Sequence, residues 1–232
     1  MTKLMFALWG PDLTTSLHSD ALRQALEAAG AERLQVNVDD AHVAPAMRIP
    51  SSDEPIGAIV SVWTSGPADV VTAALTAVSD RIAGWEVEER RPIDPPETWD
   101  GSRCEGLANV AVLRRPDELT QEEWLHRWLV DHTPIAIATQ ATFGYLQNVV
   151  VAPVTADARS FAESFAGPVS ALVEELFPIE GMTDMHAFYG SGGDDAVLTE
   201  RLTTLMASVA RIGADRDLDL VPTSRYLYSL TR

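Results

Sequence analysis

The sequence predicts an α+β protein in which one order of elements occurs twice: strand, helix, strand, strand, helix, strand. Apolar runs bounded by turn residues indicate the strands, and apolar residues spaced three and four apart indicate the helices. A segment with three prolines, 92–105, lies between the two sets and is expected to be a linker. The repeated order is that of a split β-α-β unit. We therefore expect two tandem ferredoxin-like domains, at 1–91 and 106–232.

The first domain is predicted from its turn and helix-cap residues and from the periodicity of its apolar residues. Gly10 and Pro11 end the first apolar run, and Asp20 is placed to cap a helix that Gly30 ends. Leu34, Val36 and Val38 alternate with polar residues, which is typical of a half-buried strand. We expect strands at Leu4–Trp9, Leu34–Val38, Ile56–Trp63 and Trp85–Glu89, and helices at Ala21–Ala29 and Ala68–Ile82.

The second domain begins with a strand and a well-marked helix start. Thr120 and Glu123 form a capping-box pattern, and Pro134 is expected to stop the helix that follows. Asp194 or Asp195 is placed to cap the last helix, which includes Val197–Met206. We expect strands at Leu107–Leu113, Phe143–Val151, Met182–Tyr189 and Asp219–Leu227, a helix at Gln121–Asp131, and inserted amphipathic helices at Ala158–Phe165 and Val169–Phe177.

Composition excludes several classes of function. The net charge of −17 argues against binding to nucleic acid, because phosphate binding needs clustered Lys and Arg. No apolar run approaches the length of about 20 residues that spans a bilayer, so we expect no membrane segment. Cys104 is the only cysteine, which rules out an intrachain disulfide and fits the reducing cytoplasm. We interpret Cys104 as a spare thiol in the linker rather than a reactive one.

The stretch from Val112 to Val151 resembles the EthD family of dimeric α/β-barrel proteins. The features that match are Arg115-Pro116, the helix start Leu119–Trp124, Trp128, the Asp131–Pro134 segment and Tyr145–Asn148. The close match covers about 40 residues, and the order of elements extends it to 106–228. Residues 1–95 look like a diverged copy that lacks these features. The resemblance therefore implies two ferredoxin-like domains that form an intramolecular dimeric α/β barrel.

The same resemblance implies a small-molecule ligand and no cofactor. Related barrel proteins include cofactor-free isomerases, cyclases and decarboxylases that use a histidine on small oxygenated or aromatic molecules. The alternative is a non-catalytic ligand-binding or accessory protein of a catabolic or secondary-metabolic pathway. The resemblance also allows a homodimer of the tandem chain. Neither a GxGxxG nor a P-loop sequence is present, and the histidines show no spacing that indicates a metal site.

His132 and Tyr145 are the candidate catalytic residues, and in lactone isomerases of this kind the matching histidine and tyrosine are implicated. An imidazole can take and return a proton near pH 7. At a helix C-terminus, however, His132 could instead cap carbonyl groups, and the helix dipole should raise its pKa. Tyr145 could donate a hydrogen bond to a substrate oxygen, or it could simply pack its ring.

Six further residues are candidates for ligand binding. Trp124 and Trp128 lie four apart on one helix face, where they form core or the wall of an apolar pocket. Gln147 shares a strand face with Tyr145, whereas Asn148 points to the other side. His186 and Phe188 share one face of the third predicted strand. The six candidates are Trp124, Trp128, Gln147, Asn148, His186 and Phe188.

Overall fold

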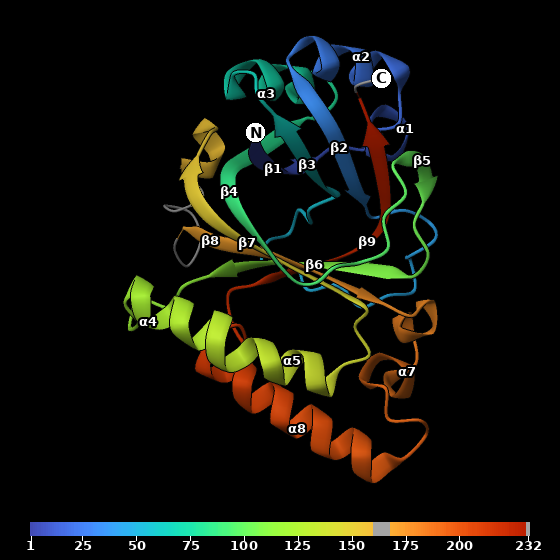
Figure 1. Ribbon diagram of the computed structural model, residues 1–232, viewed down its shortest axis with the longest axis vertical. Coiled ribbons are helices and arrows are strands. Elements are labelled where there is room, and N and C mark those ends of the chain that lie inside the picture. The colour runs from blue at the N-terminus through green and yellow to red at the C-terminus, as the bar shows by residue number, and fades with distance from the viewer. Residues whose placement is uncertain (160–167, 231–232) are drawn as a thin grey trace.

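The protein belongs to the α+β class, with one large antiparallel sheet and helices on two sides of it (Figure 1). The computed structural model describes residues 1–159 and 168–230. The strands are β1 Thr2–Trp9, β2 Ala31–Val38, β3 Ala58–Thr64, β4 Arg81–Ile93, β5 Asp100–Arg103, β6 Leu107–Arg114, β7 Gly144–Pro153, β8 Val169–Phe177 and β9 Asp219–Ser229. The α-helices are α1 Leu13–Ser16, α2 Asp20–Ala28, α3 Ala68–Thr76, α4 Gln121–His126, α5 Thr133–Thr139, α7 Met185–Tyr189 and α8 Asp195–Arg211.

The strands follow the order β2-β3-β1-β4-β7-β8-β6-β9-β5, and β2 also pairs with β9. This additional pairing joins the two parts of the sheet a second time, so the strands from β2 to β9 form a closed circuit. The N-terminal half, residues 1–93, contributes the order β2-β3-β1-β4. The C-terminal half, residues 106–232, contributes β7-β8-β6-β9, which is the same order taken strand for strand. The halves meet at β4–β7 and at β2–β9, both antiparallel.

Alternation along the strands divides the core into layers. In the N-terminal half, Leu4, Phe6 and Leu8 pack against α2 and α3. In the C-terminal half, the other outer layer packs against α4, α5 and α8, and it includes Trp124 and Trp128. The residues between these two layers face the interior of the circuit. Its apolar part contains Met5, Trp85, Val110, Leu172 and Val221, which come from both halves.

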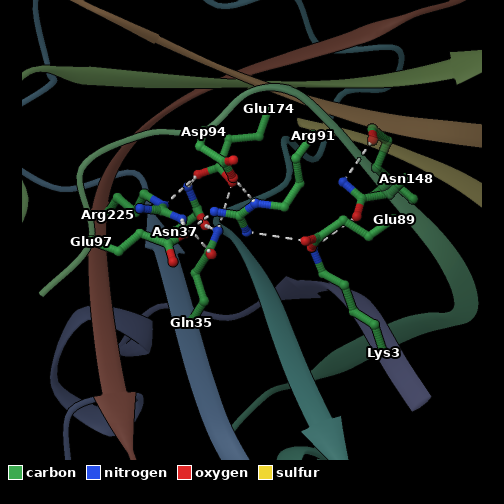
Figure 2. Close-up of polar contacts among 11 residues, drawn as sticks. Lys3, Gln35, Asn37, Glu89, Arg91, Asp94, Glu97, Asn148, Glu174 and Arg225 are labelled. Atoms are coloured by element: carbon green, nitrogen blue, oxygen red, sulfur yellow. Dashed lines mark hydrogen bonds and ion pairs between the residues drawn. The ribbon is translucent and has the colours of Figure 1, made fainter. Parts of the chain in front are cut away.

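A cluster of buried charges occupies the other part of the interior (Figure 2). The Glu174 carboxylate accepts hydrogen bonds from the Gln35 and Asn37 amides, each at 2.8 Å, and pairs with Arg225 at 3.1 Å. Lys3 donates to Asn148 Oδ1 at 2.8 Å and pairs with Glu89. These contacts join β8 to β2 and β9, and β1 to β4 and β7. Every charged group named here therefore has a partner of opposite sign or an amide, as burial requires.

The helix that begins at Thr120 runs further than the sequence predicts. The capping box is present, but Pro134 does not stop the helix. A π-helical segment, Arg127–His132, precedes α5, and the Thr133 N–H donates to the Trp128 carbonyl. The wider π turn lets the chain pass a proline, which has no N–H to donate and would clash in a regular α-helix. His132 consequently lies inside a continuous helix rather than at its end.

Three other predicted elements are corrected. The expected helix at Val169–Phe177 is β8, which pairs with β6 and β7 and is buried on both faces, so it lacks the alternation of a half-exposed strand. The expected strand at Met182–Tyr189 is instead mainly α7, preceded by a 3-10 turn at Ile179–Met182. The Asp184 carboxylate caps α7, and Gly190 ends it with φ +62°. Helix α3 ends at Thr76 rather than at Ile82, which belongs to β4.

Two further predicted segments, the linker and the first inserted helix, are only partly comparable with the structure. The expected linker, 92–105, contains the end of β4 and the strand β5, which pairs with β9. The inserted helix expected at Ala158–Phe165 falls mostly on 160–167, outside the described residues; residues 156–159 are helical. Asp194 is the residue that caps α8. None of the described helices has the length and apolar character needed to cross a membrane.

The Glu174→Gln variant tests the buried cluster. Removing this charge leaves the Arg225 guanidinium with one carboxylate partner fewer, and we expect a loss of unfolding free energy on the order of 3 kcal/mol in urea titrations. The matched control is Glu118→Gln, which breaks the exposed pair with Arg216 and should leave the urea midpoint unchanged. Equal midpoints for the two variants would contradict the assigned role of Glu174.

Candidate functional site

The helix-facing side of the C-terminal sheet carries a row of polar residues. Asn109 on β6 lies directly opposite Glu175 on β8, and Glu175 lies directly opposite Tyr145 on β7. Directly opposed residues in antiparallel strands have Cβ atoms about 4.5–5.5 Å apart. At the corresponding positions of the N-terminal half, β1 presents Leu4, Phe6 and Leu8 to its helices. The row of polar residues on β6, β8 and β7 therefore has no counterpart on β1.

Glu175 is the residue in this row with the strongest acid–base character. Its side chain is half-buried, and loss of solvent raises the pKa of its carboxyl to about 7. The Gln140 amide nitrogen, in the orientation that satisfies its contacts, donates to Glu175 Oε1 at 3.3 Å. A carboxyl group that titrates near neutral pH can both accept and return a proton, as general acid–base catalysis requires.

Asn109 connects this row to a pocket. Its side chain is 6% exposed, and its carboxamide oxygen is a buried atom that forms no hydrogen bond with the described residues. Unsatisfied buried polar groups are uncommon and are often found at functional sites. Asn109 lines a pocket of about 160 Å³ beside α7. The other residues that line it are Ala46, Met47, Leu107, Gly181, Met182, Thr183, Asp184, Met185, Phe188, Tyr189 and Leu220.

Two tyrosines accompany Glu175. Tyr145 is buried, and burial together with the Glu175 charge raises the pKa of its phenol far above the ordinary range. Burial and Glu175 also raise the pKa of Tyr189, which lines the pocket. Because their pKa values are raised, the Tyr145 and Tyr189 phenols stay neutral and can act as hydrogen-bond donors. Beside Tyr145, Gln147 donates to the Thr133 hydroxyl at 2.8 Å, and Thr133 in turn donates to the Trp128 carbonyl at 2.9 Å.

His132 has a different environment from the one that its sequence position suggests. Its Nδ1 lies 2.9 Å from the Ser208 hydroxyl of α8, and its side chain is buried between the helices. Burial lowers the pKa of the imidazole to about 4. The expectation of a raised pKa at a helix C-terminus is wrong, because the helix continues past Pro134. At neutral pH His132 is uncharged, and it does not line the pocket beside α7.

The remaining sequence-predicted candidates divide between core and site. The Trp124 and Trp128 rings lie 5.2 Å apart in the core layer beneath the helices, where Trp124 donates to the Ile212 carbonyl at 3.0 Å. Gln147 lies on the Tyr145 face, as the strand period predicts. Asn148 points into the interior of the circuit, where it contacts Lys3 and the Leu172 carbonyl.

His186 and Phe188 lie on α7 rather than on a strand. Phe188 lines the pocket and stacks on Phe177, with ring centroids 4.1 Å apart. His186 instead contacts the Ser191 hydroxyl at 2.6 Å, and it does not line the pocket. The expectation that the two side chains share one strand face is therefore wrong, because a helix separates residues two apart.

A second hollow of about 920 Å³ is an open groove beside the 92–105 segment. Cys104 lines it, and burial raises the pKa of the thiol, which keeps it protonated at neutral pH. The groove lacks the buried, unpartnered polar group that Asn109 supplies beside α7. We therefore take the pocket beside α7, with Asn109, Glu175, Tyr145 and Tyr189, as the candidate site.

Comparison with known proteins gives the fold but no family. No protein-family model matches the chain, and no curated protein sequence matches it significantly. Among solved structures, an anthrone oxidase-like protein matches with a TM-score of 0.58 at 10% identity, over 100% of this chain and 93% of that one. A proposed monooxygenase from Lactobacillus acidophilus NCFM matches with a TM-score of 0.47 at 9% identity, over 99% and 96%. Another, from Fusobacterium nucleatum, reaches 0.41 at 9% identity, over 99% and 92%.

Opposite pKa shifts at Glu175 and His132 predict opposite pH dependences of stability. The Glu175 pKa is raised from 4.5 to about 7, so its stabilising contribution is complete below pH 4.5 and is lost as the pH rises through 7. The His132 pKa is lowered from 6.5 to about 4, so its contribution is complete above pH 6.5 and is lost as the pH falls through 4.

Urea titrations between pH 4 and 8 measure both effects. Relative to Glu175→Gln, the wild-type protein should lose unfolding free energy between pH 4.5 and 7. Relative to His132→Asn, it should gain unfolding free energy between pH 4 and 6.5. A pH-independent difference from Glu175→Gln would show that Glu175 titrates in the normal range.

Proposed function

We propose that the protein is a cofactor-independent enzyme that moves a proton on a small, oxygenated metabolite, with Glu175 as the acid–base group. The observation that carries the proposal is the row of polar residues: a carboxyl whose pKa is near neutral lies directly across from Asn109, whose unpartnered carboxamide oxygen lines an apolar pocket. Pockets of this kind, mostly apolar with a few convergent polar groups, are typical of small-molecule sites.

The chemistry that suits these groups is isomerisation of a β,γ-unsaturated carbonyl compound. The Glu175 carboxylate takes a proton from the carbon next to the carbonyl, and the electron pair of that C–H bond moves towards the carbonyl oxygen. The neutral Tyr189 phenol, which lines the pocket, donates to the resulting enolate oxygen, and the Asn109 carboxamide oxygen accepts a hydrogen bond from a substrate hydroxyl. The protonated Glu175 then returns the proton to the γ-carbon of the dienolate while the C=O bond re-forms, so the C=C bond moves into conjugation with the carbonyl and no oxidation state changes.

We propose that the architecture consists of two ferredoxin-like domains, fused in one chain as an EthD-like intramolecular dimeric α/β barrel. The identical strand order in the two halves, and their two antiparallel junctions, support this description. The anthrone oxidase-like protein has a similar fold, and its name suggests a small oxygenated molecule as the class of ligand.

Two other versions of the function are distinguished by specific observations. In the first, suggested by the EthD resemblance, His132 is the base and Tyr145 its companion; His132 is uncharged at neutral pH, but its pKa of about 4 makes it a weak base. In the second, the protein binds a ligand without turnover. Glu175 lies beside Asn109 rather than in the pocket wall, which favours this version.

Exchange of the α-protons of cyclohexanone in D₂O, followed by NMR, distinguishes these versions. We expect the wild-type protein to catalyse the exchange, with kcat/KM rising with pH and a midpoint near 7 because the carboxylate is the active form. The Glu175→Gln variant should be slower by a factor on the order of 10²–10⁴. Glu180→Gln, at an exposed position three residues beyond β8, is the matched control and should exchange at the wild-type rate.

The His132→Asn variant completes the test. Our proposal predicts exchange within a few-fold of the wild-type rate, because the imidazole is held by Ser208 away from the pocket. Loss of exchange in His132→Asn with retention in Glu175→Gln would transfer the role to His132. Binding of cyclohexanone without any exchange would favour the non-catalytic version.

A further inference from the structure

One wall of the pocket beside α7 comes from the other half of the chain. Ala46 and Met47 belong to the loop 39–57, between β2 and β3, yet they line a pocket that is otherwise built from the C-terminal half. Val43 and Ala46 of this loop are buried against Leu107 and Phe177 of β6 and β8. The loop is therefore part of the core next to the site rather than a separate surface feature.

Several bonds fix the loop to β9. The Ile49 and Leu220 backbones form a bridge with N–O distances of 3.1 and 2.8 Å. The Ser51 backbone N–H and hydroxyl donate to the Asp219 carboxylate at 2.7 and 2.8 Å. Within the loop, Arg48 pairs with Asp39 at 2.8 Å. These bonds hold Met47 at the pocket independently of any ligand.

Two methionines from opposite halves stand at this pocket with much of their apolar surface in solvent. Met47 is 68% exposed and Met185, on α7, is 50% exposed, and both line the pocket. Single exposed methionines are ordinary on a protein surface, but two that line one pocket offer apolar surface that the same bound ligand can cover. Methionine is unbranched and adapts its shape to what it contacts. A ligand in the pocket would give both side chains an apolar surface to cover.

The size and charge of the pocket limit the ligand. A volume of about 160 Å³ is close to the cavity of about 150 Å³ that holds benzene in another protein, so the pocket suits one six-membered ring. Asp184 lines the pocket and Glu175 lies beside it, so an anionic ligand would meet like charges.

We propose that Met47 is a specificity-determining residue, through which the N-terminal half limits the site in the C-terminal half to an uncharged, single-ring ligand. The inference rests on the proposed function for the location of the site, but not for its chemistry. Met47 closes over the ring from one side and Met185 from the other, and together they leave no room for a second fused ring.

Calorimetric titration with three probes tests the inference: cyclohexanone, the two-ring ketone α-tetralone and the anion cyclohexanecarboxylate. We expect the wild-type protein to bind cyclohexanone at least tenfold more tightly than either other probe. Met47→Ala should weaken cyclohexanone several-fold and strengthen α-tetralone about tenfold, in line with the loss of a few methylene contacts. Met206→Ala, on α8 with 46% exposure and outside the pocket wall, is the matched control and should change neither affinity.

The outcomes separate the role of Met47 from the proposed enzymatic activity. Because Met47 is exposed, Met47→Ala should unfold at the wild-type temperature, and the binding changes can then be assigned to the pocket. Unchanged affinities in Met47→Ala, or equal wild-type affinities for the one-ring and two-ring ketones, would overturn the inference. So would a failure of the wild-type protein to bind cyclohexanone. Binding that follows the expected pattern, without proton exchange, would instead contradict the proposed enzyme and leave the size limit intact.

Discussion

The closure of the sheet is the constraint on which the rest of the structure depends. The β4–β7 and β2–β9 pairings each satisfy two strand edges that would otherwise expose unpaired backbone groups. In the closed sheet, each half keeps its own helices outside and turns its remaining face inward. That inner face must then be filled jointly. The apolar residues of both halves fill one part of it, and the charges around Glu174 and Lys3 fill the other.

The buried charges also explain why the halves fit each other in one register. Apolar side chains tolerate small displacements, whereas a buried guanidinium such as Arg225 needs its carboxylates at hydrogen-bond distance. The partners of Glu174 are Gln35 and Asn37 from β2 and Arg225 from β9. A shift of one residue at the β2–β9 junction would turn these side chains to the other face and leave the charges unpaired.

The two halves share a strand order but differ in what they place beneath their helices. The N-terminal half fills that layer with leucine, phenylalanine and valine, so this layer serves only to pack its helices on the sheet. The C-terminal half keeps Asn109, Tyr145 and Glu175 there. The N-terminal half still takes part in the site, since its loop 39–57 is bonded to β9 and forms one wall of the pocket. A site shared in this way depends on both halves although only one carries the acid–base group.

The sequence by itself determined the α+β class, the doubled order of strands and helices in outline, the capping box at Thr120, and the opposite orientations of Tyr145 and Asn148. All of these follow from local periodicity and capping chemistry, which act over a few residues. Only the tertiary structure decided that Val169–Phe177 is a strand, because its burial between β6 and β7 removes the alternation that marks strands. With that segment expected as a helix, Glu175 had no predicted neighbours, and its position opposite Asn109 could not be foreseen. The environment of His132 was likewise decided by packing, since Ser208 and the passage of the helix beyond Pro134 are not encoded in the residues around it.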